Sequence, residues 1–332
     1  MGKMRRPDYV IWIFTGKCNL NCKHCYAYRF RTVKELTLEE KLRLIKEIGE
    51  LKVDYVGLSG GEPLIHPHFP LMLKALREYE VYVSMVTNGT VFKDEVAGIL
   101  SDMNVFVNIS VDGPREIHDA IRGAGVFDKV MENVEKYRKH GIRYGFVMTI
   151  TKLNYKYVDQ VIELAIDKGA ERLSILPAMP TGKALINNIA VGSDEYLEAL
   201  RRVDEKAEEY KYPVSLWCTP FAPLVVKSKY ISYSSCRLSE GLDIDPEGNI
   251  LLCDILDIKI TSIRDKSLSE AWKIYLDHPL LKYINEPPNP PTVCKKCPIF
   301  NYCRTGCYAR SYLLYKDYNK GDPLCPRTRY NL

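Results

Sequence analysis

The 332-residue sequence has little glutamine, no block of like charge and no long apolar run. Gln160 is its only glutamine, and this bias is compatible with a protein that works at high temperature. The apolar run Tyr9–Phe14 is too short for a signal peptide or a membrane span, so we expect a cytoplasmic protein without a membrane partner. Lys plus Arg number 47 against 42 for Asp plus Glu, a mild and dispersed excess that gives no reason to expect nucleic acid as a partner.

Cysteine, in contrast, is abundant, with eleven residues. In a reducing compartment most thiols stay free, so metal ligation is favoured over disulfides, and the odd count agrees with this. Cys18, Cys22 and Cys25 follow the apolar stretch Tyr9–Thr15 at spacings of four and three. A [4Fe–4S] cluster normally takes four thiolates, so three of them leave one iron open to another ligand. Tetrahedral zinc is the alternative occupant of such a loop.

The loop from Cys18 to Tyr26 resembles the signature of the radical S-adenosylmethionine (SAM) superfamily. The resemblance implies that Cys18, Cys22 and Cys25 hold a [4Fe–4S] cluster whose open iron binds the amino and carboxylate groups of SAM. Reductive cleavage of SAM would then give a 5′-deoxyadenosyl radical that abstracts hydrogen from the substrate. It also implies an anaerobic enzyme and a low-potential electron donor of the ferredoxin or flavodoxin type.

Short apolar runs alternate with helical spacing in the first two thirds of the chain. The runs are Tyr9–Thr15, Val53–Leu58, Val81–Thr87, Val105–Val111, Arg143–Ile150 and Arg172–Leu176. Strands that alternate with helices predict a parallel sheet with ligands at the carboxyl ends of its strands. Six units are fewer than the eight of a closed barrel, so we expect an open, partial (β/α)6 barrel over residues 1–212, as in the superfamily that the loop resembles. A further helix is expected from Ser193 to Tyr210.

The alternation stops after about Tyr212, and eight of the eleven cysteines follow. We therefore expect a second, cysteine-rich α/β extension over residues 213–332. Asp243–Asp245 and Ile250–Leu252 predict a short hairpin around the turn 246–249. The segment Pro287–Pro291 predicts an extended linker before the last cysteines.

A polar motif follows the second expected strand, in Ser59-Gly60-Gly61-Glu62-Pro63. Glycines allow the backbone to approach a ligand, and the Glu62 carboxylate can receive an ammonium group. By resemblance Gly60, Gly61 and Glu62 contact the methionine end of SAM. The alternative is a tight turn with a solvated glutamate.

Other polar residues end neighbouring strands and collect on the same rim. Asn88 lies in Thr87-Asn88-Gly89 after the third strand, and Ser110 ends the fourth. The resemblance implies that Ser110 and Arg122 hold the ribose and carboxylate of SAM, with two parallel bonds available from the arginine. It places Tyr26 and Leu176 beside the adenine. A turn hydroxyl, a surface ion pair and a core aromatic are the alternatives for Ser110, Arg122 and Tyr26.

The later cysteines resemble the SPASM extension of radical SAM enzymes, in a pattern that also includes Gly248, with four residues between it and Cys253. The resemblance implies two auxiliary [4Fe–4S] clusters. One would be held by Cys294, Cys297, Cys303 and Cys325, and the other by Cys236, Cys253 and Cys307. Cys218 is a candidate for the remaining corner, which would use every cysteine of the chain. If Cys218 is instead a buried apolar residue, that cluster has an open iron. Zinc ribbons are the alternative.

Asp254 directly follows Cys253. By resemblance to sulfatase-maturing enzymes, it would accept the proton released when a substrate radical is oxidised, which requires hydrogen-bond reach of the substrate. The alternative is a carboxylate that only accepts backbone bonds near a cluster. Asp243 and Asp245 are weaker candidates for the same role.

The resemblance implies an oxidoreductase that matures a peptide or protein, with the auxiliary clusters taking up an electron. Modification of a tetrapyrrole (haem precursor) or a tungstopterin cofactor is the alternative, since Arg310 and Gly321–Cys325 occur in a similar context in such enzymes. A zinc-binding scaffold without activity is the alternative from another class. No leader-recognition domain fits ahead of Cys18, so we expect a polypeptide substrate to be recognised by the barrel opening or by a separate protein.

Overall fold

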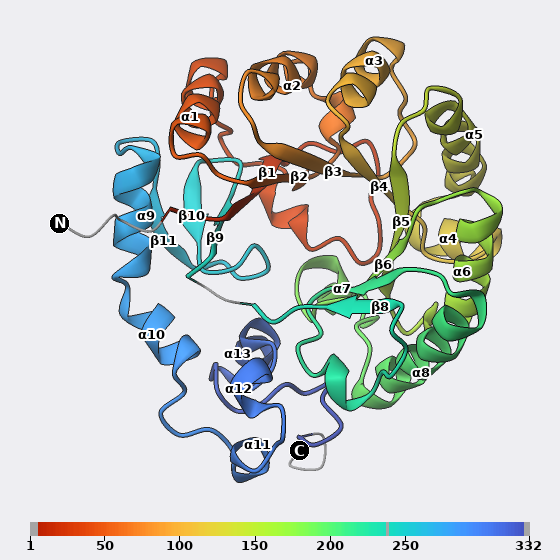
Figure 1. Ribbon diagram of the computed structural model, residues 1–332, viewed down its shortest axis with the longest axis vertical. Helices are drawn as coiled ribbons and strands as arrows, with labels where there is room; N and C mark the ends of the chain where they lie inside the picture. The colour runs from red at the N-terminus through yellow and green to blue at the C-terminus, as the bar shows by residue number, and fades with distance from the viewer. Residues whose placement is uncertain (1–5, 237–238, 329–332) are drawn as a thin grey trace.

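The computed structural model describes residues 6–236 and 239–328, and in this part of the chain one curved sheet of eleven strands carries helices on its outer side (Figure 1). The strand order is β11-β10-β9-β1-β2-β3-β4-β5-β6-β7-β8. Sequential order from β1 to β8 is what repeated strand-helix-strand connections produce.

Strands β1 to β6 are all parallel and confirm the expected partial barrel. They are β1 (Tyr9–Thr15), β2 (Tyr55–Gly60), β3 (Tyr82–Thr87), β4 (Phe106–Ser110), β5 (Tyr144–Ile150) and β6 (Leu173–Pro177). Every residue of β4 is buried, as expected for a strand covered on both faces. Because the strands are parallel, their carboxyl ends meet at one edge of the sheet.

The outer helices bury one apolar face each, except α4 (Arg115–Arg122), whose buried residues are His118, Ile121 and Arg122. The others are α1 (Leu38–Glu50), α2 (Phe69–Arg77), α3 (Asp94–Asp102), α5 (Val126–Lys139), α6 (Val158–Asp167) and α8 (Ser193–Tyr210). A capping box starts α1, because the Thr37 hydroxyl accepts from the Glu40 amide and the Glu40 carboxylate accepts from the Thr37 amide. Leu44, Ile45 and Ile48 of α1 then enter the core.

The carboxyl-terminal third extends the same sheet at both ends. Strands β7 (Val214–Leu216) and β8 (Ile231–Tyr233) continue beyond β6, and β9 (Gly241–Ile244) lies parallel beside β1. β10 (Asn249–Leu251) and β11 (Lys259–Ser262) follow in antiparallel pairing, and β9 with β10 forms the expected hairpin. The sequence pattern did not indicate that this hairpin pairs with the first strand. The domain boundary between residues 212 and 213 stays a prediction.

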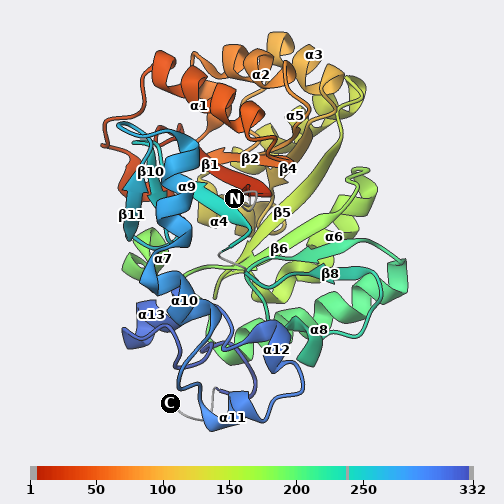
Figure 2. The ribbon, with the colours of Figure 1, turned by 60° about the vertical axis from the view of Figure 1, so that its left-hand side comes forward.

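Short helices complete the fold. They are η1 (Ala27–Phe30), η2 (Pro63–Ile65), η3 (Tyr155–Tyr157), α7 (Gly182–Ile186), η4 (Ala222–Leu224), α9 (Leu268–Leu276), α10 (Pro279–Asn285), α11 (Thr292–Lys295), α12 (Phe300–Cys303) and α13 (Tyr308–Tyr315). Figure 2 shows α10 to α13 gathered below the sheet, away from α1 to α3. Among the described residues no helix combines the length and the apolar content that a membrane crossing requires.

Candidate functional site

The first three cysteines lie in the loop that leaves the carboxyl end of β1. Cys22 is buried, whereas Cys18 and Cys25 are half-buried. The Cys18 sulfur accepts from the Leu20 amide at 3.4 Å and from the Asn88 side chain at 3.8 Å. Three thiols on one short loop, next to a strand end where ligands bind, fit a metal cluster better than they fit a packing role.

Glu35, which the sequence analysis did not single out, anchors the start of this loop. Its carboxylate accepts from the Thr15 hydroxyl at 2.7 Å and from the Gly16 amide at 2.9 Å. Burial acts to raise the pKa of Glu35, but hydrogen bonds from His66, Thr15 and Gly16 outweigh it and lower the pKa to about 2. Glu35 is therefore ionised near neutral pH and holds the backbone two residues before Cys18.

The glycine motif after β2 packs directly on the cysteine loop. A Cβ atom at Gly61 would come within 2.0 Å of the Lys17 carbonyl oxygen, and one at Gly60 within 2.4 Å of the Thr15 oxygen. Gly60 also has a φ of 133°, which favours glycine. These two glycines are required for close backbone contact between the ends of β1 and β2.

Glu62 is fully buried, and its carboxylate is held by three donors of the protein. Its oxygens accept from the Thr87 hydroxyl at 2.9 Å, the Leu64 amide at 3.1 Å and the Asn88 amide at 2.7 Å. Burial raises its pKa to about 7. The Glu62 carboxylate is therefore not the solvated carboxylate of the alternative interpretation, and it joins the ends of β2 and β3. Its contact with SAM stays a prediction.

Arg122 reaches the cysteine loop through a buried ion pair. Its Nε donates to Asp112 Oδ2 at 2.7 Å, and its Nη1 lies 4.0 Å from the Cys22 sulfur. His24, inside the cysteine loop, places Nε2 at 2.7 Å from the same Asp112 oxygen. Burial acts to raise the pKa of Asp112, but Arg122 and His24 outweigh it and hold the pKa well below its usual range. Arg122 is buried and paired, so it is not the solvent-exposed ion pair of the alternative interpretation.

Asp112, which the sequence analysis did not single out, connects the members of this cluster. Its second oxygen accepts from the Thr149 amide at 2.9 Å, and its own amide donates to His118 Nδ1 at 3.1 Å. One carboxylate thus joins the cysteine loop, α4 and β5. The tetrapeptide Ser110–Gly113, which follows an expected strand, is the sequence feature that could have pointed to Asp112.

The remaining SAM-contact candidates lie on the same edge. Ser110 is buried at the end of β4, and Leu176 is half-buried near the end of β6. Burial and the neighbouring Asp254 carboxylate raise the pKa of Tyr26, whose side chain lies beside Asp254. Tyr26 therefore connects the first cysteine loop to the residue that follows Cys253.

Four later thiols form one electrostatic group. The pKa of Cys218 is raised by burial and by the neighbouring Cys236 and Cys307, and that of Cys253 by burial, by Asp254 and Asp243, and by Cys307. Cys236 is exposed as a whole, yet its thiol loses hydration near Cys307, and its pKa is raised to about 12. These pKa values rise partly because neighbouring thiolates repel one another, and that repulsion is relieved when the thiolates bind a cationic metal centre.

Asp243 and Asp254 border this group. Asp243 accepts from the Asp254 amide at 2.8 Å, and the ligand atoms of Asp243, Cys253 and Asp254 all lie within 4.8 Å of one another. Asp245 is buried and accepts from the amides of Glu247 and Asn249, so it stabilises the hairpin turn. Of the three aspartates, Asp243 and Asp254 are thus placed beside thiols and Asp245 is in the turn.

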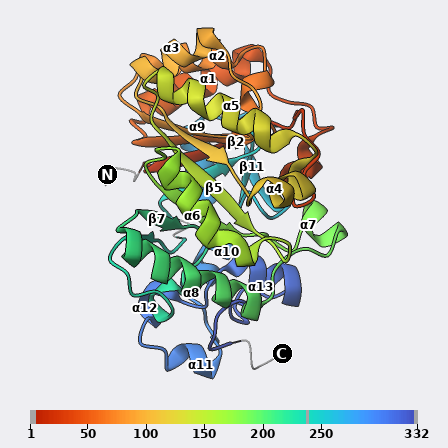
Figure 3. The same ribbon diagram turned by 90° about the vertical axis from the view of Figure 1, so that its right-hand side faces the viewer.

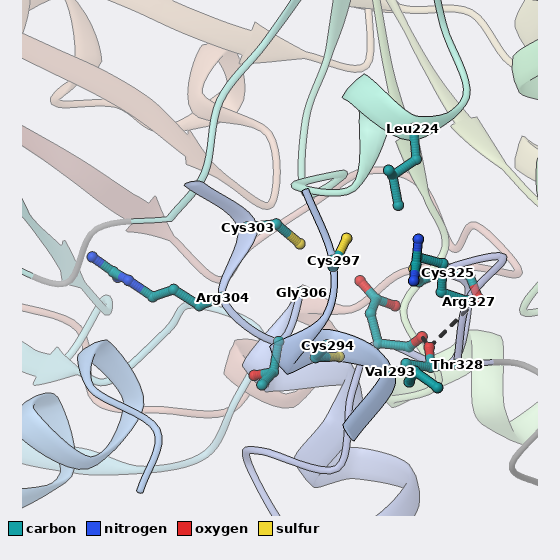
Figure 4. A pocket seen from close by; sticks show the side chains of 12 residues that line it. Leu224, Val293, Cys294, Cys297, Cys303, Arg304, Gly306, Cys325, Arg327 and Thr328 are labelled. Carbon is teal, nitrogen blue, oxygen red and sulfur yellow. Dashed lines mark hydrogen bonds between the residues drawn. The ribbon is translucent and has the colours of Figure 1, made fainter. Parts of the chain in front are cut away.

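The four remaining thiols line one pocket. They are Cys294, Cys297, Cys303 and Cys325. Figure 4 shows Cys297 and Cys303 turning their sulfur atoms toward the space between them. Burial raises the pKa of Cys294 to about 11, with Cys325 and Cys297 adding to the shift. Four thiols from separate turns around one pocket fit a closed, four-thiolate metal centre.

Three comparisons agree with this arrangement. Residues 12–165 match the family model described as the radical SAM superfamily. An AdoMet-dependent heme synthase of Methanosarcina barkeri (strain Fusaro / DSM 804) is 26% identical over 96% of both chains. The mycofactocin maturase MftC of Mycobacterium tuberculosis (strain CDC 1551 / Oshkosh) is 29% identical, over 96% of this chain and 83% of its own.

Solved structures share the fold. The structure of anSMEcpe with bound AdoMet and the Cp18Cys peptide has a TM-score of 0.75 at 20% identity and covers 97% of this chain and 94% of its own. Streptococcus suis SuiB bound to the precursor peptide SuiA also has a TM-score of 0.75, at 15% identity, and covers 97% of this chain and 76% of its own. These likenesses confirm the expected α/β fold with a cysteine-rich carboxyl-terminal extension.

Proposed function

Because residues 12–165 match the radical SAM superfamily model, we propose that this chain is an enzyme that uses SAM to modify a peptide or protein substrate by hydrogen abstraction. The observation that carries the proposal is the set of hydrogen bonds from Arg29, four residues after Cys25, to the carbonyls of Asp254, Ile255 and Leu256. It brings the three-thiol loop after β1 and the cysteine-rich extension to one place. A radical-generating centre and a group that can take up a proton would then face the same substrate.

Cys18, Cys22 and Cys25 would hold a [4Fe–4S] cluster with one open iron for SAM. When bound, this pair supplies one-electron cleavage of SAM and a 5′-deoxyadenosyl radical that takes hydrogen from the substrate. The protein fixes the geometry of the loop. Asn88 donates toward the Cys18 sulfur, Arg122 lies near the Cys22 sulfur, and both contacts favour thiolates.

The SAM molecule itself would meet polar groups from several strand ends. Arg122 keeps donors free beyond its bond to Asp112 and would hold the SAM carboxylate, with Ser110 near the ribose. At the methionine end, Gly60 and Gly61 allow the ends of β1 and β2 to approach closely, and Glu62 orders this region through Thr87 and Asn88. Tyr26 and Leu176 would border the adenine.

Two auxiliary [4Fe–4S] clusters fit the remaining thiols. Cys218 lies within electrostatic range of Cys236 and Cys307 and adopts a φ of 54°, a strained conformation for a residue with a Cβ atom. Its carbonyl is held by Arg310 at 2.7 Å. We therefore assign Cys218 as the fourth ligand of the first auxiliary cluster, beside Cys236, Cys253 and Cys307. The pocket of Cys294, Cys297, Cys303 and Cys325 would hold the second.

Asp254 would accept a proton from the substrate. Arg29 donates to the carbonyls of Asp254, Ile255 and Leu256 at 2.7–2.8 Å and fixes the turn that carries this side chain. Burial raises the pKa of the Asp254 carboxyl, which strengthens it as a base relative to a solvated aspartate. An electron released together with that proton would leave through the auxiliary centres.

A haem-precursor substrate is the second candidate. It is favoured by the AdoMet-dependent heme synthase, which matches 96% of this chain and 96% of its own length. The maturase of comparable identity supports a peptide, and the two SPASM-type structures match in fold. Tungstopterin chemistry has no comparable support among these relatives.

Anaerobic reconstitution with iron and sulfide tests the proposal. We expect a brown protein that forms 5′-deoxyadenosine from SAM under dithionite, and a Cys18→Ala, Cys22→Ala, Cys25→Ala variant that forms none. Zinc retention without turnover would instead support the scaffold. Mass spectrometry of candidate peptides and of iron coproporphyrin after turnover separates the two substrate classes.

A further inference from the structure

One surface beside the first cysteine loop combines positive charge with exposed apolar side chains. We define this cysteine-loop surface by Lys23, Tyr28, Lys183, Leu185 and Ile186. Figure 3 shows α7 protruding at the edge of the molecule beside α4 and the chain after β1. The Lys23 amide donates to the Ile121 carbonyl of α4, so these segments are in contact.

Acidic residues are missing from the segments that build this surface. Residues 16–34 contain five lysines and arginines and no aspartate or glutamate, and residues 178–192 contain Lys183 and no acid. In the described part of the chain neither Lys23 nor Lys183 has an acidic partner. On the outer helices, in contrast, cations commonly sit beside acids, as Lys129 and Lys136 do at Glu132. The five residues that define the cysteine-loop surface thus include two cations and no acid.

Apolar side chains project from the same place. Ile186 is 71% exposed and Leu185 is 62% exposed, more than any other large apolar residue among those described. The preceding Ala184 is fully buried, so α7 packs against the protein through Ala184 while Leu185 and Ile186 at its end are exposed. Exposed apolar groups rimmed by polar ones mark interaction sites in soluble proteins.

Hydrogen bonds hold α7 against the cysteine loop. The Lys183 amide donates to the Cys25 carbonyl at 3.1 Å, and the Asn187 side chain donates to the Lys23 carbonyl at 2.8 Å. The Lys183 ammonium donates to Asn21 Oδ1 at 2.7 Å. A protein that binds the end of α7 would therefore contact a segment that is hydrogen-bonded directly to the loop of Cys22 and Cys25.

We propose that the cysteine-loop surface is the docking site of an acidic electron-transfer protein that reduces the first cluster. The inference rests on the proposed function, because each SAM cleavage consumes one electron. The donor loses that electron, and SAM takes it up as its carbon–sulfur bond breaks. Opposite charge speeds the encounter, and Leu185, Ile186 and Tyr28 supply a small apolar contact suited to brief association.

The surface suits an electron donor better than it suits the substrate. An electron crosses a layer of backbone, whereas a substrate atom must reach the radical through an open path. The loop and α7 close that path here through the bonds from Lys183 and Asn187. An acidic peptide that binds this surface is the competing occupant, and the experiment below separates it.

The experiment measures 5′-deoxyadenosine formation by the reconstituted enzyme with two reductants. One is a small acidic [4Fe–4S] ferredoxin, reduced and freed of excess reductant, and the other is dithionite. We expect Lys23→Glu, and separately the double variant Leu185→Ser with Ile186→Ser, to raise the KM for ferredoxin about tenfold at low salt. Dithionite-driven rates should stay within about twofold of wild type, because dithionite needs no docking surface.

Lys139→Glu is the matched control. Lys139 is exposed at the end of α5, just before β5 begins, and so lies at the opposite edge of the sheet. Ferredoxin kinetics equal to wild type in both surface variants would overturn the proposal. The proposal would also be overturned if a surface variant kept the wild-type KM for ferredoxin but was no longer inhibited by an added acidic peptide. The surface would then bind the peptide and not the electron donor. No product with dithionite in the wild type would instead refute the proposed function itself.

Discussion

Arg310 and Asp322 form a two-bond ion pair inside the cysteine-rich extension. Arg310 Nε and Nη2 donate to the two carboxylate oxygens of Asp322 at 3.0 and 2.6 Å, and both side chains are buried. The same carboxylate accepts from the Cys307 amide, while Arg310 also donates to the Cys218 carbonyl. The pair therefore joins three chain segments that carry thiols of both expected auxiliary centres.

We predict that Asp322→Asn loses both auxiliary centres and keeps the first. The change leaves the buried Arg310 charge unpaired and frees the turns of Cys307 and Cys325, at a cost of about 3–5 kcal/mol in the free energy of unfolding. Iron content should fall to about that of a single [4Fe–4S] cluster, with dithionite-driven 5′-deoxyadenosine formation retained. Asp317→Asn, five residues away and outside the pair, is the control. Full iron content in Asp322→Asn would contradict this role.

A second prediction concerns Asp112, which binds both Arg122 and His24, the latter in the first cysteine loop. Asp112→Asn should raise the KM for SAM at least about tenfold and lower the free energy of unfolding by about 3 kcal/mol, because a buried arginine loses its counter-charge. Asp119→Asn is the control, since asparagine also caps a helix. An unchanged KM with only lower stability would limit Asp112 to a structural role.

A third prediction follows from His118, which is buried and accepts the Asp112 amide on Nδ1. Burial, together with the charge of Arg122, lowers its pKa from 6.5 to about 4. Its contribution to stability is complete above pH 6.5 and is lost as the pH falls toward 4, because the unfolded chain takes up the proton first. Wild type should lose about 2 kcal/mol more than His118→Asn between pH 7.5 and 5. Parallel pH profiles in urea unfolding would contradict this.

The fourth prediction tests the chemistry assigned to Asp254. Asp254→Asn keeps the backbone carbonyl that Arg29 binds but removes the basic carboxylate. We expect 5′-deoxyadenosine formation to continue while the modified substrate, followed by mass spectrometry, falls at least about a hundredfold. The exposed Asp257→Asn serves as the control. A normal product yield from Asp254→Asn would refute the proton-accepting role.

Local periodicity was enough to predict much of this fold. The six strands of the partial barrel begin and end within about two residues of the expected ranges, because buried β-branched runs and helical spacing are properties of short segments. The helix Ser193–Tyr210 has the expected bounds. The pairing of β9 with β1 could not be predicted, since edge pairing depends on where a distant hairpin packs.

The candidate site shows the same division. Cysteine spacing pointed to the first group of thiols, because Cys18, Cys22 and Cys25 lie close in the sequence. The expected division of the later thiols into two groups came from the resemblance to the SPASM extension, since Cys218 and Cys307 are far apart in the sequence. The bonds from Asp112 to His24, from Glu62 to Thr87 and from Arg310 to Cys218 join residues 25 to 92 positions apart. No local pattern encodes such contacts, which arise when the carboxyl ends of parallel strands converge.

The most direct test of this account is electron–nuclear double resonance on the reduced, reconstituted enzyme with SAM that carries isotope-labelled amino and carboxylate groups. The account predicts coupling of the labelled nitrogen and oxygen to the cluster held by Cys18, Cys22 and Cys25. An enzyme with that cluster intact and no coupling to the labels would contradict it.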